Sequence, residues 1–154
     1  MPKKQRRPKS ILNRRARYDY AIADTYIVGM ELKGAEVKAL RLGHGQLNGS
    51  YVTIKDNQLM LLNATISGTS AVHIKEEDQT RTRRLLAKRK EIDQLILAKQ
   101  QGKTIIPLEI LNQGRFIKLK IATAQGKKRY DKRETIKKRS EDRSIQAALK
   151  SRNH

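Results

Sequence analysis

The sequence predicts a mainly β protein: a small, partly closed antiparallel barrel with flanking helices and a basic C-terminal tail. Its apolar segments are short, and tight turns join most of them, which favours hairpins over parallel crossovers. Nearly all Val, Ile, Leu and Phe residues lie between positions 18 and 126. Closure into a barrel would protect the edges of such short strands. An open sheet with helices on one face is the alternative.

Strands are expected where β-branched or alternating apolar residues lie between turn residues. These segments are residues 18–32, 50–55, 58–66, 104–111 and 115–124. Asp56 and Asn57 tolerate a left-handed backbone, so they predict the tight turn of a hairpin. Gly29 suggests a bulge, and Pro107 suggests a bulge or a sheet edge.

Two helices are expected between the strands. Residues 34–45 predict a short helix with Glu36 in its first turn and Gly43 at the left-handed position after its last turn. Residues 80–101 show the longest helical pattern, which Gly102 ends. The resulting order of strands, helix, hairpin, helix and hairpin is best met by a barrel of the oligonucleotide-binding kind.

The charge is large and uneven. The chain of 154 residues has 35 Lys and Arg against 15 Asp and Glu, a net charge of +20. The basic surplus is densest at the two ends, which predicts a basic N-terminal arm over 1–12, a body over 13–130 and a basic tail over 131–154. Such a surplus indicates a polyanionic partner, with nucleic acid first and an anionic membrane second.

Catalytic chemistry is not expected. The chain has no cysteine, which excludes disulfides, thiolate zinc sites and cysteine nucleophiles. Its three histidines lie in separate segments without metal-ligand spacing, and the segment GHGQLNG (43–49) lacks the lysine of a phosphate-binding loop. We expect no cofactor and no metal. No apolar run can span a bilayer and no signal peptide is visible, so a cytoplasmic protein without membrane contact is expected.

Basic clusters beside tyrosines favour RNA over duplex DNA. Arg14, Arg15 and Arg17 can pair with phosphates, while neighbouring tyrosines can stack on unpaired bases. A second basic group opens the longer expected helix and consists of Arg81, Arg84 and Lys88. Helical spacing would place these three on one side, as an RNA contact or as a solvated helix end. Charge alone leaves these two readings even, and the small cost of basic residues at a helix N-terminus favours RNA contact. From the residues alone, Glu36 is better explained as an acid favoured by the helix dipole.

Six motifs, in this order, resemble those of one known family. They are NRRARYDY (13–20), GAEVKALR (34–41), SYV (50–52), NATI (63–66), RTRRLL (81–86) and GKKRYDKRETIKKR (126–139). Across about residues 12–150 the sequence resembles the SsrA-binding proteins (small protein B), the partners of transfer-messenger RNA in ribosome rescue.

The resemblance implies a function in trans-translation. The protein would bind the tRNA-like domain of transfer-messenger RNA and deliver that RNA to stalled ribosomes. Its tail would probe the small-subunit decoding centre and the empty mRNA channel, being disordered alone and helical on the ribosome. Elongation factor Tu and alanyl-tRNA synthetase would be indirect partners, because they serve the same RNA. A monomer without enzymatic activity is expected.

The resemblance also assigns residues. The positions that match the family's RNA-binding face are Asn13, Arg14, Arg15, Glu36, Lys38, Arg41, Lys127 and Lys128. The charge pattern adds Arg17, Arg81, Arg84 and Lys88. For Glu36 the resemblance implies a hydrogen-bond acceptor for RNA, which reverses the preference from the residues alone. The predicted decoding-centre residues are Tyr130, Asp131, Lys132, Arg133, Ile136, Lys137, Lys138 and Arg139.

Three other functions compete with this assignment. A structural ribosomal protein would have a similar small barrel and basic arms. An RNA-processing enzyme lacks a visible catalytic group of residues. A peripheral membrane protein would need an amphipathic apolar face, which the sequence does not show.

Overall fold

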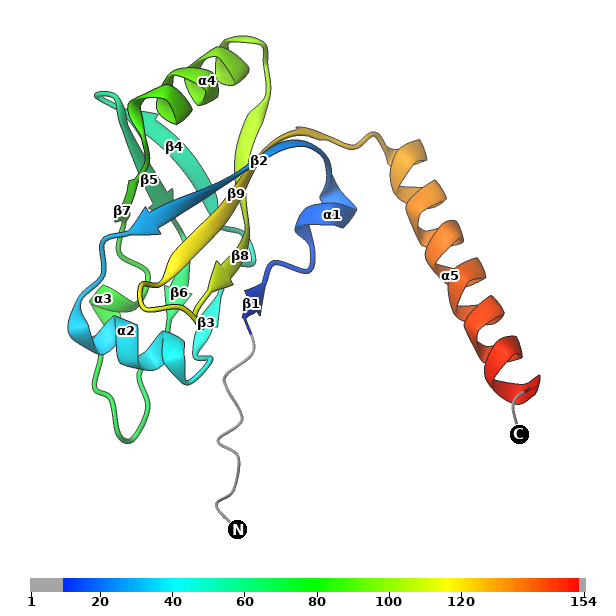
Figure 1. The fold of residues 1–154 in the computed structure, drawn as a ribbon, viewed down its shortest axis with the longest axis horizontal. Helices are drawn as coiled ribbons and strands as arrows, with labels where there is room; N and C mark the ends of the chain where they lie inside the picture. The colour runs from blue at the N-terminus through cyan, green and yellow to red at the C-terminus, as the bar shows by residue number, and fades with distance from the viewer. Residues whose placement is uncertain (1–9, 153–154) are drawn as a thin grey trace.

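A ring of antiparallel strands forms the body, and a long helix stands apart from it (Figure 1). The computed structural model describes residues 10–152, except for the side chains of residues 129–131. The strands are β1 Ile11–Leu12, β2 Tyr20–Met30, β3 Gly45–Gln46, β4 Tyr51–Lys55, β5 Gln58–Leu62, β6 Thr65–Ile66, β7 Arg83–Leu86, β8 Thr104–Leu111 and β9 Lys118–Gly126. The helices are α1 Ala16–Asp19, α2 Gly34–Arg41, α3 Glu76–Gln79, α4 Arg89–Gln100 and α5 Arg129–Arg152.

The ring runs β8–β4–β5–β7–β2–β9, and β9 pairs with β8 to close it. Every pairing in it is antiparallel. The extent of strand pairing differs around the ring. One residue pair, Val52 with Ile105, joins β4 to β8, whereas β2 and β9 pair over most of their length. The predicted antiparallel β fold with flanking helices is therefore confirmed, as a ring of strands in which some neighbours pair over only a short length.

The core lies inside the ring and follows the alternation of the strands. Leu59 and Leu61 of β5 and Leu119 and Ile121 of β9 are fully buried. Leu95 of α4 is also fully buried in this core, so α4 covers one end of the ring. A smaller cluster lies under α1 and consists of Ala16, Ile106, Leu108, Ala122 and Ala124. Together these residues position α1 against β8 and β9.

The predicted turns are confirmed in detail. Asp56 and Asn57 have φ angles of 51° and 59°, as a tight hairpin turn requires, and Gly43 after α2 has a φ of 87°. Pro107 marks a bulge, with a register shift before Glu109. It is not at a free edge, because β8 pairs with β9 on one side and with β1 and β4 on the other.

In β2 the expected position of the bulge was wrong. The shift in pairing with β9 lies between Ile22 and Thr25, whereas Gly29 is regularly paired with Leu86 of β7. A Cβ added at Gly29 would lie 3.3 Å from the Cβ of Leu86. Gly29 therefore serves close packing of two strands and does not mark an irregularity.

The longer helix was predicted to start too early. Residues 83–86 form β7, and α4 begins only at Arg89. Arg83 and Leu85 are buried while Arg84 and Leu86 are exposed, which is the two-residue period of a strand. The helical spacing of Arg81, Arg84 and Lys88 was coincidental, and these residues do not share a helix face.

Gly68 anchors the long connection between β6 and α3. A Cβ at this position would meet the carbonyl oxygen of Val72 at 2.9 Å and the amide nitrogen of Ile74 at 3.0 Å. We predict that Gly68→Ala lowers the free energy of unfolding by about 1–3 kcal/mol, because backbone must move to admit the methyl group. Urea denaturation measures this loss. Gly34→Ala is the control, since outside its two neighbours and the backbone of its own helix no atom lies within 4 Å of the added Cβ; equal stability of both variants would contradict the prediction.

Candidate RNA-binding surface

The segment that leads into α1 is anchored by one residue, and this segment and α1 together present three cations. Asn13 donates two hydrogen bonds to carbonyl oxygens of β8, from its backbone at 2.8 Å and from its side-chain amide at 2.9 Å. Arg14, Arg15 and Arg17 are exposed. Asn13 therefore fixes the segment on the ring, and the arginines are available at the surface.

Two of these arginines line a small hollow at the surface of β8 and β9. Its volume is about 130 Å³, and it is lined by Leu12, Asn13, Arg14, Arg17, Leu108, Glu109 and Lys120. Three of these side chains are cationic and only one is acidic. Such a hollow favours an anion such as a phosphate group. Lys120 was not among the predicted RNA-binding residues, although its outward position in the alternation of β9 was a usable signal.

The start of the tail is tied to α1. The backbone N–H of Lys127 donates to the carbonyl oxygen of Asp19 at 2.9 Å. Its ammonium group donates to the carbonyl oxygen of Arg17 and to the hydroxyl of Thr135, both at 2.9 Å. Lys128, the next residue, is exposed. The two predicted basic groups, 13–17 and 127–128, therefore meet at one place.

A second set of contacts joins α5 to α1. The ammonium of Lys132 lies 3.5 Å from the carboxylate of Asp19 and 5.7 Å from the centroid of the Tyr18 ring. The same carboxylate lies 3.7 Å from the guanidinium of Arg15. Asp19 thus neutralises part of the local charge where the N-terminal arginines and the tail come together.

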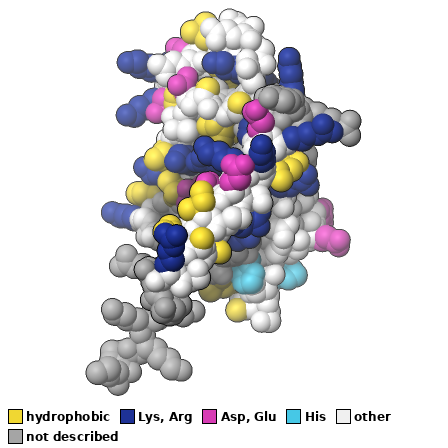
Figure 2. All heavy atoms as spheres, turned by 90° about the vertical axis from the view of Figure 1, so that its right-hand side faces the viewer, with side chains coloured by type: hydrophobic (Ala, Val, Ile, Leu, Met, Phe, Trp, Pro, Cys, Tyr) yellow, Lys and Arg dark blue, Asp and Glu magenta, His cyan; other side chains and the backbone are white. Residues whose placement is uncertain are grey.

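Beyond this junction, α5 is exposed and stands away from the ring (Figure 1). The predicted tail residues on its described part are Lys132, Arg133, Ile136, Lys137, Lys138 and Arg139. The side chains of Tyr130 and Asp131 lie outside the described part. Seen from the side that α5 occupies in Figure 1, the surface carries more Lys and Arg side chains than acidic ones (Figure 2).

Glu36 lies in the interior, where the prediction of direct RNA contact does not fit. Its side chain is 2% exposed. One carboxylate oxygen accepts from Nε and Nη2 of Arg81, at 3.0 and 2.5 Å, and from the backbone N–H of Lys33 at 3.1 Å. The other accepts from Nε of Arg83 at 2.5 Å. Both oxygens are occupied by protein donors, so Glu36 positions other groups.

Arg83, which the sequence did not single out, completes this buried cluster. Its side chain is fully buried, and its two Nη atoms donate to the carbonyl oxygens of Ala64, Asp78 and Gln79 at 2.8, 3.2 and 3.0 Å. The guanidinium therefore ties β7 to α3 and to the loop before β6. A buried arginine needs this complete set of partners, because an unpaired charge in the interior is strongly destabilising.

The cluster sets the ionisation of Glu36. Burial by itself would raise the pKa of this carboxyl, but the hydrogen bonds from Arg83, Arg81 and the Lys33 amide outweigh burial and lower the pKa from its ordinary value. Burial lowers the pKa of Arg83, and the bond to Glu36 opposes that change. Arginine titrates far above neutrality, so the pair is ionic at pH 7.

The other predicted residues of α2 differ in accessibility. Lys38 is exposed. Arg41 is half-buried, and its Nη atoms donate to the carbonyl oxygens of Asn112, Gly114 and Arg115 at 2.6, 2.6 and 2.9 Å. Arg41 therefore holds the turn between β8 and β9. Arg84 on β7 and Lys88 before α4 are exposed on other elements and do not join the group at α1.

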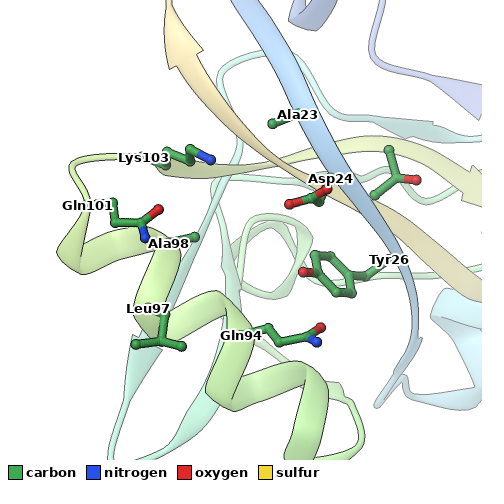
Figure 3. A pocket seen from close by; sticks show the side chains of 9 residues that line it. Ala23, Asp24, Tyr26, Gln94, Leu97, Ala98, Gln101 and Lys103 are labelled. Carbon is green, nitrogen blue, oxygen red and sulfur yellow. The ribbon is translucent and has the colours of Figure 1, made fainter.

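A larger pocket, of about 690 Å³, lies between β2 and α4 and includes none of the predicted site residues (Figure 3). Tyr26 and Gln94 point toward one another across it. Within residues 10–152 no group of three or more His, Asp or Glu is placed to hold a metal ion. None of the helices in that range has the length and apolar character needed to cross a membrane.

Comparison with known proteins identifies the family. The family model described as "SmpB protein" matches residues 10–151. The chain belongs to the SmpB family. A relative from Gloeobacter violaceus, named SsrA-binding protein, is 42% identical over 139 residues, which cover 90% of this chain and 91% of the relative. One of the same name from Thermosipho africanus is 46% identical over 140 residues, covering 90% and 94%.

A solved structure agrees with this membership. It is described as "tmRNA-SmpB: a journey to the center of the bacterial ribosome" and is 36% identical in sequence. The likeness covers 82% of this chain and 94% of that chain, with a TM-score of 0.64. The ring of strands with its flanking helices is therefore the fold of the SmpB family.

Glu36→Gln tests the buried cluster. Removing the charge leaves Arg83 buried without its counter-ion, so we predict a loss of about 3 kcal/mol in the free energy of unfolding at pH 7. Because the folded-state pKa is lowered, the contribution of Glu36 is complete above its unfolded pKa of about 4.3 and is lost as the pH falls through the folded value. The difference between wild type and variant should therefore shrink in acid.

Urea denaturation at pH 7 and at successively lower pH measures that difference. Glu141→Gln on the exposed part of α5 is the matched control and should leave stability unchanged at each pH. A Glu36→Gln deficit that is absent at pH 7, or that persists undiminished in acid, would contradict the role assigned to the cluster.

Proposed function

We propose that this chain binds transfer-messenger RNA and brings it to stalled ribosomes for trans-translation, without catalysing a reaction itself. The match to the SmpB family over residues 10–151 supports this proposal. So do relatives named SsrA-binding protein and a similar structure whose description joins tmRNA, SmpB and the ribosome.

One observation carries the proposal. The segment that carries Arg14, Arg15 and Arg17 meets the segment that carries Lys127 and Lys128 at the contact of Lys127 with Arg17, although more than 100 residues separate the two groups in sequence. The hydrogen bonds of Lys127 to α1 bring them together at the base of the tail. A folded RNA presents its phosphates on a defined surface, so a fixed cluster of cations recognises its shape better than scattered charges do.

The RNA element that we propose for this cluster is the tRNA-like domain. The arginines and Lys128 would contact its backbone, with Lys120 adding a cation in the hollow between β8 and β9. Exposed Lys38, Arg84 and Lys88 would contact RNA at the periphery. Asn13, Glu36, Arg41 and Arg81 would support binding through the positions of other groups, because their described side chains are engaged within the protein.

The tail has a separate role in this proposal. Lys132, Arg133, Ile136, Lys137, Lys138 and Arg139, together with Tyr130 and Asp131, would enter the decoding centre and the mRNA channel. The structure has residues 129–152 as one helix, in contact with the body at α1. A single exposed helix is marginal in water, so we still predict that the tail alone is largely coil and becomes helical on ribosomal RNA.

Two indirect partners are proposed because they act on the same RNA. Elongation factor Tu and alanyl-tRNA synthetase would act on transfer-messenger RNA that carries this protein, without a dedicated surface on it. We propose that the chain acts as a monomer in the cytoplasm, where ribosomes translate.

Binding to the isolated tRNA-like domain at about 0.2 M salt, with ordinary tRNA as competitor, tests the proposal. Salt at this concentration suppresses the non-specific phosphate attraction that any protein of charge +20 must show. We expect tight binding that tRNA does not displace. Equal, weak and salt-sensitive binding to both RNAs would contradict the proposal and would favour a structural ribosomal protein.

Truncation after Tyr130 separates the tail from RNA binding. We predict that the truncated chain binds the tRNA-like domain within a few-fold of the full chain, because the three arginines at α1 and Lys127–Lys128 remain. Peptide tagging in a reconstituted translation reaction on an mRNA without a stop codon should be lost. Tagging by the truncated chain would rule out the tail mechanism. Leu97→Ala on α4, in the full chain, is the control that should still tag.

A further inference from the structure

The turn between β8 and β9 presents an aromatic side chain with no partner in the protein core. Phe116 is the only phenylalanine of the chain, and it is 69% exposed, more than any other large hydrophobic residue described. Its neighbour Ile117 is 6% exposed and belongs to the core, so the backbone at Phe116 cannot shift far. A lone exposed apolar residue is common on proteins; what distinguishes this one is how firmly its turn is held.

Two reciprocal sets of hydrogen bonds fix the turn to the end of α2. Arg41 donates from α2 to three carbonyl oxygens of the turn, those of Asn112, Gly114 and Arg115. In return, the buried side-chain amide of Asn112 donates to the carbonyl oxygen of Leu40 in α2, at 2.8 Å. A turn held in this way presents its side chains in a defined orientation, which reduces the entropy lost on binding.

The charges beside the Phe116 side chain indicate the kind of partner. The guanidinium carbon of Arg115 lies 5.5 Å from the centroid of the Phe116 ring. Lys118, the first residue of β9, follows two positions later and is exposed. An aromatic face flanked by cations is the arrangement that proteins use to stack unpaired bases while contacting the adjoining phosphates. An apolar protein partner would not make use of the positive charges of Arg115 and Lys118.

We propose that Phe116 and Arg115 form a stacking platform for an unpaired base of the RNA partner, and that Arg41 is the residue that positions this platform. The proposal rests on the function proposed above, because it takes the tRNA-like domain as the RNA. It adds a contact on the β8–β9 turn to the predicted cluster at α1. It also gives Arg41 a role through the turn in place of direct contact.

The first test is the affinity of full-length variants for the tRNA-like domain. Phe116→Ala should weaken binding by about 5- to 100-fold, the effect of losing one base–aromatic stack. Phe116→Trp should retain or strengthen binding, because indole also stacks, whereas Phe116→Leu should resemble alanine. Leu97→Ala, which removes another exposed apolar side chain, is the matched control and should bind as wild type does.

The second test observes stacking directly. The chain has no tryptophan, so Phe116→Trp introduces a single indole fluorophore. Its emission should be quenched when the tRNA-like domain is added, while the emission of Leu97→Trp should stay unchanged. Arg41→Ala combined with Phe116→Trp should show reduced quenching at saturating RNA. Arg41→Ala and Phe116→Ala should lower affinity less together than the product of their separate effects, as expected for residues that act as a unit.

The outcomes separate the two proposals. If wild type does not prefer the tRNA-like domain over tRNA, the proposed function fails and this inference fails with it. If wild type does prefer it, but Phe116→Ala binds equally well and Phe116→Trp is not quenched, only the stacking platform is overturned. If Phe116→Ala weakens only ribosome association, the Phe116 side chain contacts the ribosome and the proposal is likewise overturned.

Discussion

The buried carboxylate of Glu36 is the interaction on which the arrangement of the surface depends. It joins α2 to Arg81 and to Arg83, and Arg83 in turn holds the carbonyl oxygens at the end of α3 and before β6. Because these charges are out of water, the cluster tolerates few other geometries. The position of α2 then determines where Arg41 donates hydrogen bonds to the β8–β9 turn. A buried ion pair thus controls, through one short helix, a part of the surface that it does not touch.

The fold also reconciles a large net charge with a stable core. The apolar residues are confined to the ring, and most of the surplus cations lie before α1 and after β9. These two regions are adjacent because β2 and β9 are paired from Tyr20 with Gly126 onward, so the segments beyond that pair leave the ring together. Asp19 lies between them and offsets part of their repulsion. The cations are concentrated where a polyanion can bind, while the ring itself carries a modest charge.

Much of this could be predicted from the sequence, and the failures have physical causes. The hairpin at Asp56–Asn57, helix α2 and the alternation of β9 are local features, and residue types determine them. The strand at Arg83–Leu86 was missed because one of its two inward residues is an arginine, which a hydrophobic pattern counts as polar. Glu36 was assigned to RNA by the family resemblance, against the preference from the residues alone, and nothing corrected this because its long-range ion pairs leave no mark in neighbouring residues. The same limit hid the roles of Arg41 and Phe116, since their connection spans more than 70 residues.

When it is helical, α5 sets a fixed distance between its two ends. Its 24 residues span about 36 Å at 1.5 Å per residue, and its first turn is clamped to α1. The number of residues in such a helix sets both its length and the direction that its last side chains face. Each residue adds only 1.5 Å to the length but rotates the far end by about 100°. Removing one residue near its start would therefore shorten the reach only slightly and yet turn Ile145 and Leu149 to another side. In the proposed function, contacts made by the far end of this segment would therefore depend on both its length and its register.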